Sequence, residues 1–326
     1  MNKIIFSLLC LSLSFNSFAA EKVQIVASIK PIQLMVQQLV GDLGEVEVLI
    51  PEGASPHHYN LKPSDMRKLG QTDLVVWIGP AMEQFLTKTM QRQKSAVIQL
   101  MEGEGEAEHH DDHETEHHDH EEAQKHDDHH KEAHHEDDHD DHEKHHDDEH
   151  EHHHDHGDSD PHIWMDPVLM ISAADHIRDE LVEQFPNLKS ELDSNFAEFK
   201  QKVTDVDQSI KSQLAPHKDK GFIVFHDAFS LFVGHYDLNQ LAYFTFDPSH
   251  APGAKKVAEV QSLITSKDAV CVFSEPQFEA KIVKRITAGL DINKGQLDPL
   301  AIDIKPEQGY TGFLIGLADN IENCLK

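Results

Sequence analysis

The sequence predicts an α/β protein in which a long helix joins two mostly parallel sheets. Short apolar runs rich in β-branched residues alternate with helical patterns on both sides of a charged central tract, as in βα units around parallel sheets. The run 73–79, DLVVWIG, is apolar almost throughout, like a strand buried on both faces. A single apolar stripe over 188–214 predicts one helix about 40 Å long.

The first half of the chain contains the elements of one βα lobe. Pro31 marks a helix start and Gly41 its end, with apolar residues between them at three- and four-residue spacing. The expected strands are 23–29, 46–50, 73–79 and 96–100, and the expected helices are 31–41, 63–69 and 81–90.

The second half repeats the alternation after two longer helices. Pro167 begins the first, which runs to about Phe185. The 188–214 stripe follows, and two helices broken near Thr204 are the alternative to one. The expected strands are 222–225, 241–246, 270–273 and 296–300, and the expected helices are 229–236, 254–265, 280–288 and 312–325.

The N-terminal sequence indicates export. Lys3, an apolar run over 4–15 and the small-x-small site at 17–19 are typical of a signal peptide, which we expect at 1–20. Cys271 and Cys324 are then the cysteines left in an oxidising compartment, which favours a disulfide. Two buried free thiols are the alternative.

The charge of the chain is concentrated in one segment. Residues 102–160 hold 27 acidic side chains and three lysines, and so carry 24 of the 31 net negative charges. A basic face for nucleic acid is absent, and we expect no nucleic-acid partner. The same segment holds 20 of the 28 histidines and almost no apolar residues, which predicts a disordered, weakly metal-binding insertion.

This composition produces a false enzyme signature. The metalloprotease pattern H-E-x-x-H occurs four times within the tract, at 113–117, 135–139, 142–146 and 150–154. The pattern works only on a stable helix beside a substrate cleft, and a segment made of little but His, Glu and Asp repeats it by composition. We therefore expect no enzymatic activity.

Three histidines outside the tract indicate an ordered metal site. His57 lies in the loop beyond the strand at 46–50, His162 directly follows the tract, and His226 ends the apolar run at 222–225. Parallel α/β sheets bind ligands beyond the carboxyl ends of their strands, so His57 and His226 could face one cleft from opposite lobes. Three imidazoles with an oxygen ligand suit tetrahedral Zn²⁺, whereas manganese favours more carboxylate.

Several motifs together resemble a known family. They are IKPIQ at 29–33, PEGASPHHY at 51–59, LKPSD at 61–65, DLVVWIGP at 73–80, HIWMDP at 162–167, FIVFHDAF at 222–229, CVFSEPQF at 271–278 and LDPL at 297–300. With the histidine-rich tract they resemble the zinc-uptake periplasmic substrate-binding proteins (the ZnuA type) of ABC transporters. The likeness runs from about Val23 to the C-terminus.

The resemblance implies a set of ligands, carried over position by position. His57 and His162 from the first lobe and His226 from the second would bind zinc, with Asp298 or water as the fourth ligand. Manganese-binding relatives generally have a carboxylate where His226 stands. Some zinc members place a glutamate just before the first histidine, and here that position is Pro56, which removes one candidate ligand.

The resemblance also implies the organisation and the function. We expect a signal peptide at 1–20, a first lobe at 21–186 that contains the tract at 102–160, a linking helix at 187–215 and a second lobe at 216–326. The family's second-lobe disulfide matches Cys271 and Cys324. The expected function is capture of zinc in the periplasm by a monomer and delivery to an inner-membrane ABC permease.

Three other functions remain as alternatives. They are a manganese-type carrier of the same fold, a metal-buffering protein that acts through the tract, and a metallohydrolase with three histidines and an open metal position. A hydrolase would also need a general base and a substrate pocket beside the metal, and the sequence shows no motif for either.

Overall fold

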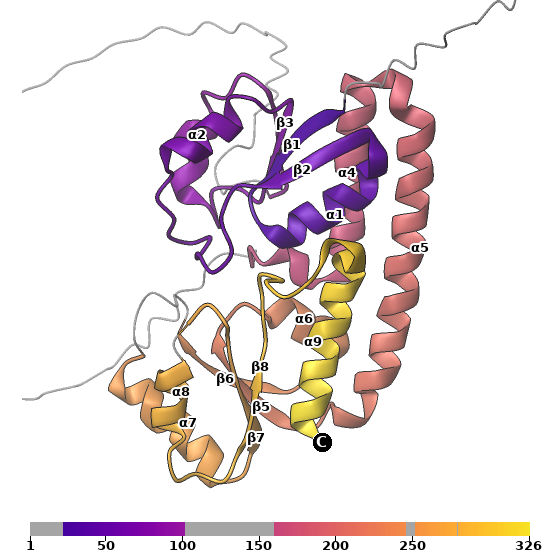
Figure 1. The fold of residues 1–326 in the computed structure, drawn as a ribbon. Helices are drawn as coiled ribbons and strands as arrows, with labels where there is room; N and C mark the ends of the chain where they lie inside the picture. Colours follow the sequence, from indigo (N-terminus) through magenta and orange to yellow (C-terminus); the bar gives the residue numbers. More distant parts are fainter. Residues whose placement is uncertain (1–21, 102–159, 246–251, 279) are drawn as a thin grey trace, which may run out of the picture. The chain divides into compact units, whose positions relative to one another are not determined.

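The computed structural model describes residues 22–101, 160–245, 252–278 and 280–326 (Figure 1). The expected signal peptide and the expected disordered tract lie outside these residues, apart from Asp160 at the end of the tract. In the part of the chain that the structure describes, every helix is too short or too polar to cross a bilayer.

Each half of the chain forms one parallel four-stranded sheet. The first sheet has the order β2-β1-β3-β4, and the second has the corresponding order β6-β5-β7-β8. The strands of the first are β1 (Val23–Ala27), β2 (Gly44–Val48), β3 (Leu74–Trp77) and β4 (Ala96–Gln99). Those of the second are β5 (Gly221–His226), β6 (Gln240–Thr245), β7 (Ala269–Ser274) and β8 (Asn293–Gln296). The two-sheet α/β prediction is confirmed.

The central strands are apolar because they are covered on both faces. All four residues of β3 and all six of β5 are buried, as expected for inner strands of parallel sheets between helical layers. The helices are α1 (Lys30–Val40), α2 (Pro63–Leu69), α3 (Thr87–Met90), α4 (Pro167–Gln184), α5 (Lys189–Leu214), α6 (Ser230–Tyr236), α7 (Ala254–Thr265), α8 (Ala280–Ile286) and α9 (Gly309–Leu325).

The long stripe forms one continuous helix, α5, of 26 residues, about 39 Å in length (Figure 1). One face of α5 is buried against α1, α4 and α9, through the side chains of Leu192, Phe199, Val203 and Ile210. Thr204 does not interrupt it, since its hydroxyl donates to the carbonyl of Lys200 one turn earlier at 2.8 Å. The two-helix alternative is wrong.

The two sheets share one hydrophobic core along these helices. A single cluster of buried side chains includes Ile25 of β1, Phe199 of α5, Phe222 of β5 and Phe313 of α9. The outer faces of the sheets have smaller clusters of their own, under α2 and α3 in the first and under α7 and α8 in the second. The helices α1, α5 and α9 therefore form a common frame for both sheets.

Three elements differ from the sequence prediction by three residues or more. The expected strand at 296–300 is β8 at Asn293–Gln296, because Asp298 draws the following backbone N–H groups of Leu300 and Ile302 to its own carboxylate. The expected helix at 81–90 is only α3 with a short 3-10 turn before it. In this region the chain turns at Gly79. The carboxylate of Glu83 then accepts hydrogen bonds from the backbone N–H groups of Ile78 and Gly79, directly after β3.

The last helix begins three residues earlier than predicted, at Gly309. The N–H of Tyr310 is satisfied by the side-chain oxygen of Gln38 in α1, at 3.0 Å. Gly309 has a φ of 60°, and a Cβ there would lie 2.6 Å from the Gln38 amide. The positive φ favours glycine, and the Gln38 side chain would have to shift to admit a Cβ. The contact that starts the helix comes from another part of the chain.

Candidate metal centre

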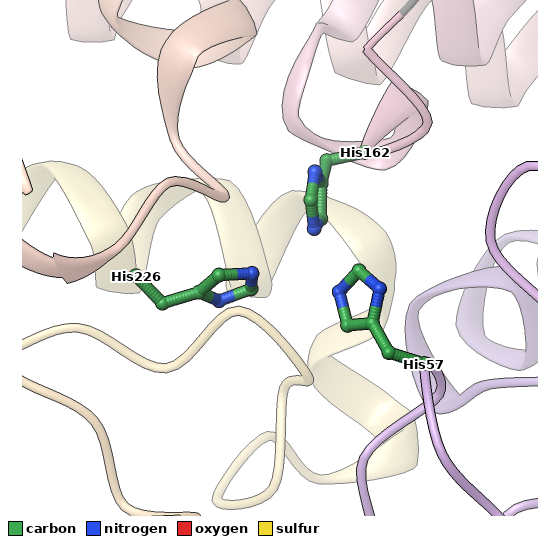
Figure 2. Close-up of side chains that lie close together, drawn as sticks. All are labelled: His57, His162 and His226. Carbon is green, nitrogen blue, oxygen red and sulfur yellow. The ribbon is translucent and has the colours of Figure 1, made fainter. Parts of the chain in front are cut away.

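Three histidines from three separate segments meet at one point (Figure 2). His57 lies in the loop after β2, His162 directly before the turn that leads into α4, and His226 at the carboxyl end of β5. One ring nitrogen of each lies within 4.8 Å of the others. The ring centroids are 5.4, 5.3 and 5.2 Å apart. The structure thus brings together the three histidines that the sequence singled out.

The three rings line one pocket. His162 and His226 are 5% and 4% exposed, and His57 is half-buried. The other polar side chains in the lining include Glu275 and Gln277, and apolar side chains close the rest, among them Trp164, Phe278, Pro299 and Leu300. Among the residues that the structure describes, Nε2 of His162 and both ring nitrogens of His226 have no hydrogen-bond partner.

His162 is held in place by the residue two positions before it. Asp160 accepts hydrogen bonds from the backbone N–H of His162 at 3.0 Å and from its Nδ1 at 2.7 Å. Nε2 therefore faces the other imidazoles. Burial lowers the pKa of His162 despite the nearby Asp160, which favours the neutral ring that binds metals.

The segment that carries His162 is fastened to the second half of the chain. Trp164 donates from Nε1 to the carbonyl of Pro299 at 2.7 Å, and the hydroxyl of Tyr310 donates to the carbonyl of Trp164 at 2.9 Å. Asp166 caps α4 by accepting from the N–H groups of Val168 and Leu169. His162 is thereby fixed relative to the second half of the chain.

Asp298, expected as a fourth ligand, lies outside the group of converging nitrogens. Its carboxylate accepts hydrogen bonds from Gln277 Nε2 at 2.7 Å, from the backbone N–H of Leu300 at 3.0 Å and from that of Ile302. These bonds shape the loop after β8, whose carbonyl oxygens accept from Lys30 at the start of α1 and from Trp164 before α4. In this geometry Asp298 holds the loop that closes the pocket.

Sequence reasoning missed Glu275, which lines the pocket with the three histidines. It follows β7, the neighbour of β5 in the second sheet, and is 2% exposed. The strand-end rule that indicated His226 applies equally to Glu275, so the signal was present in the sequence.

The donor set of the pocket is suited to one class of ligand. Three imidazoles around one point match a divalent transition metal such as Zn²⁺, Cu²⁺ or Ni²⁺. A tetrahedral Zn²⁺ would take its three nitrogens at about 2.0–2.1 Å and keep one position for an oxygen ligand. The arrangement can therefore hold a single ion with little movement of the chain.

The predicted disulfide is present. Cys271 of β7 and Cys324 of α9 are bonded across 53 residues, with 5.9 Å between their Cα atoms. The free-thiol alternative is wrong. The bond ties the last helix to the sheet that carries His226.

Comparison with known proteins agrees with this site. The family described as "Zinc-uptake complex component A periplasmic" matches residues 25–324. The chain belongs to this family. Its curated relatives include proteins named "High-affinity zinc uptake system protein ZnuA". The one from Haemophilus influenzae is 43% identical over 92% of this chain and 92% of its own length, and that from Yersinia pestis is 32% identical over 95% and 94%.

Solved structures show the same fold. A crystal structure of ZnuA superposes with a TM-score of 0.71 at 24% identity, covering 94% of this chain and 100% of the other. The Zn(II)-bound ZnuA-like domain of AdcA from Streptococcus pneumoniae gives a TM-score of 0.66 at 21% identity, covering 94% and 99%. The α/β architecture with two parallel sheets and a long helix is thus that of the family.

Proposed function

We propose that this protein is the zinc-capturing substrate-binding component of an ABC importer and delivers its ion to a membrane permease. The observation that carries the proposal is the convergence of His57, His162 and His226, with ligand nitrogens within 4.8 Å of one another. The family is described as a periplasmic component of zinc uptake, and relatives are named high-affinity zinc uptake proteins.

Zinc fits the donor set better than manganese does. All three converging ligand atoms are imidazole nitrogens, which suit Zn²⁺, whereas Mn²⁺ favours carboxylate oxygens. The fourth position would be filled by Asp298 or by water. Asp298 would have to give up hydrogen bonds that hold the loop after β8, which favours water.

Transport is favoured over hydrolysis by the placement of the nearest carboxylates. Asp160 is hydrogen-bonded to the outer nitrogen of His162, and Glu275 lies beside Nδ1 of His226. The first is hydrogen-bonded to its imidazole, and the second faces the far side of His226 at 3.6 Å. A hydrolase would need such a group turned toward a metal-bound water. We therefore propose that the protein is not an enzyme.

The parts of the proposal that concern export and the division of the chain are assigned from the sequence. We propose a signal peptide at 1–20 and export to the periplasm as a monomer, with lobes at 21–186 and 216–326 joined by 187–215. The tract at 102–160 would bind zinc weakly and raise its concentration near the pocket, because its imidazoles and carboxylates are dense but not arranged around one point. A protein that buffers metal through the tract alone is the second candidate.

Titration with zinc in the presence of a competing chelator tests the proposal. The parent should bind one zinc tightly and several weakly, and the variant with His57, His162 and His226 all replaced by Ala should lose only the tight site. His58→Ala is the matched control, since His58 is exposed beside His57. Tight 1:1 binding by the triple variant would refute the ligand assignment.

Deletion of 104–158 separates the two candidate functions. The shortened chain should keep the tight site and lose the weak ones. If the tight site disappeared with the tract, buffering by the tract would replace capture in the pocket as the function.

A further inference from the structure

Glu275 is a buried carboxylate for which the proposed ligand set has no role. The residue is 2% exposed, and neither of its oxygens has a hydrogen-bond partner among the described residues. Burying a carboxylate without hydrogen bonds is unfavourable, so its place in the pocket calls for a partner. The nearest candidate is His226, whose Nδ1 lies 3.6 Å from Glu275 Oε1.

The geometry places Glu275 behind His226 rather than among the ligands. The group of ligand atoms within 4.8 Å of one another contains the three histidines and not Glu275. With Nδ1 beside the carboxylate, Nε2 on the opposite side of the imidazole is left to face His57 and His162. A ring nitrogen that donates to a carboxylate leaves the other nitrogen as the lone-pair donor.

His162 has the corresponding arrangement, with a carboxylate hydrogen-bonded to its Nδ1. Its Nδ1 contacts Asp160 at 2.7 Å, while its Nε2 has no hydrogen-bond partner in the part of the chain that the structure describes. Two imidazoles from different segments of the chain thus each have a carboxylate next to Nδ1, one at hydrogen-bond distance and one 0.9 Å farther away.

On the basis of the proposed zinc site, we propose that Glu275 is the positioning carboxylate of His226. It accepts a hydrogen bond from Nδ1–H when zinc binds Nε2. The bond fixes the tautomer and the ring orientation of the ligand contributed by the second sheet. The bond also supplies the hydrogen-bond donor that the buried Glu275 carboxylate lacks. The bound zinc ion adds positive charge nearby. Asp160 performs the same role for His162 from the start.

Two variants of Glu275 and one control test this role. Glu275→Ala removes the acceptor and should weaken tight zinc binding about 10- to 100-fold, with one tight site remaining. Glu275→Gln keeps the shape and an acceptor oxygen and should lose less. Glu83→Gln is the control for neutralising a buried carboxylate, because Glu83 is 0% exposed and bonds the end of β3 outside the pocket. It should leave zinc affinity unchanged.

A spectroscopic measurement separates positioning from a general loss of packing. In the zinc-loaded parent, the ¹⁵N–¹H spectrum of the imidazoles should show a slowly exchanging proton on Nδ1 of His226. Glu275→Ala should lose this proton, while the Nδ1 proton of His162 stays. Absence of the His226 proton in the loaded parent, or its persistence in Glu275→Ala, would overturn the assignment.

The outcomes also distinguish this inference from the proposed function. If the parent and His226→Ala bind zinc alike, the histidine site itself fails. If His226→Ala loses tight zinc while both Glu275 variants bind as the parent does, only the role of Glu275 fails. An equal loss of affinity in Glu83→Gln would also overturn that role, because the effect would then be one of stability.

Discussion

Three carboxylates have surroundings that raise their pKa: Glu83, Glu275 and Asp298. Burial is the main cause in each case. Glu83 is 0% exposed and accepts hydrogen bonds from the N–H groups of Ile78 at 2.9 Å and Gly79 at 3.2 Å. Burial raises the pKa of Glu83 to about 7, although these bonds and the nearby Ser28 oppose it. The end of β3 is therefore sensitive to pH near neutrality.

Glu83→Gln should change the pH dependence of stability. The pKa of Glu83 is about 7 in the folded protein and 4.5 ordinarily. Between pH 4.5 and pH 7 the folded protein therefore holds a proton on Glu83 that the unfolded chain has lost. The carboxyl's stabilising contribution is full below pH 4.5 and is lost as pH rises through 7. The loss amounts to about 3 kcal/mol. Urea unfolding of zinc-free parent and variant from pH 4.5 to 8 should show the parent losing stability relative to the variant, whereas parallel profiles would contradict it.

At the scale of elements, the loop after β8 joins the second sheet to α1 and to the turn before α4. The carbonyl of Pro299 accepts from Trp164, and that of Ile302 accepts from Lys30 at 2.7 Å. Asp298 shapes this loop through the N–H groups of Leu300 and Ile302. Ala301 has a φ of 56°, a conformation unfavourable for a residue other than glycine, which those bonds help to hold.

Asp298→Ala should destabilise the zinc-free protein by about 1–3 kcal/mol, since buried donors lose their acceptor. Asp303→Ala is a suitable control in the same loop region, because Asp303 is exposed. Chemical denaturation without zinc measures the effect independently of any ligand role. Equal stability of Asp298→Ala and the parent would show that the carboxylate is not needed to hold the loop.

Local patterns in the sequence were sufficient for most elements. They failed where a hydrogen bond to a particular side chain sets the start or the end of an element. The inner strands and α5 follow from their own apolar residues, and His226 follows from its place at a strand end. The start of α9 depends on Gln38, and the end of β8 on the carboxylate of Asp298. The role of Glu275 depends on its distance from His226, which no spacing in the sequence reveals.

At the scale of the whole described chain, contacts within the protein itself join the two sheets. They share one core along α1, α5 and α9, and hydrogen bonds from Lys30, Trp164 and Tyr310 connect segments of the two halves. His235 of α6 adds a further link, with Asp207 of α5 at 2.7 Å and Asp166 at 3.3 Å. Opening by a wide hinge would break all of these contacts.

Zinc binding should therefore move the sheets little relative to each other. Small-angle X-ray scattering of the variant lacking 104–158 should give the same radius of gyration with and without zinc, within error. The deletion removes any compaction of the tract from the signal. A clear decrease on adding zinc would indicate hinge closure and contradict a frame that is already formed.

A crystal structure of the zinc-loaded protein, with anomalous scattering recorded on both sides of the zinc edge, tests the central claim most directly. One strong anomalous peak should lie between His57, His162 and His226, about 2.0–2.1 Å from a nitrogen of each. A peak elsewhere among the described residues, or no peak at these histidines at full occupancy of the tight site, would contradict the account.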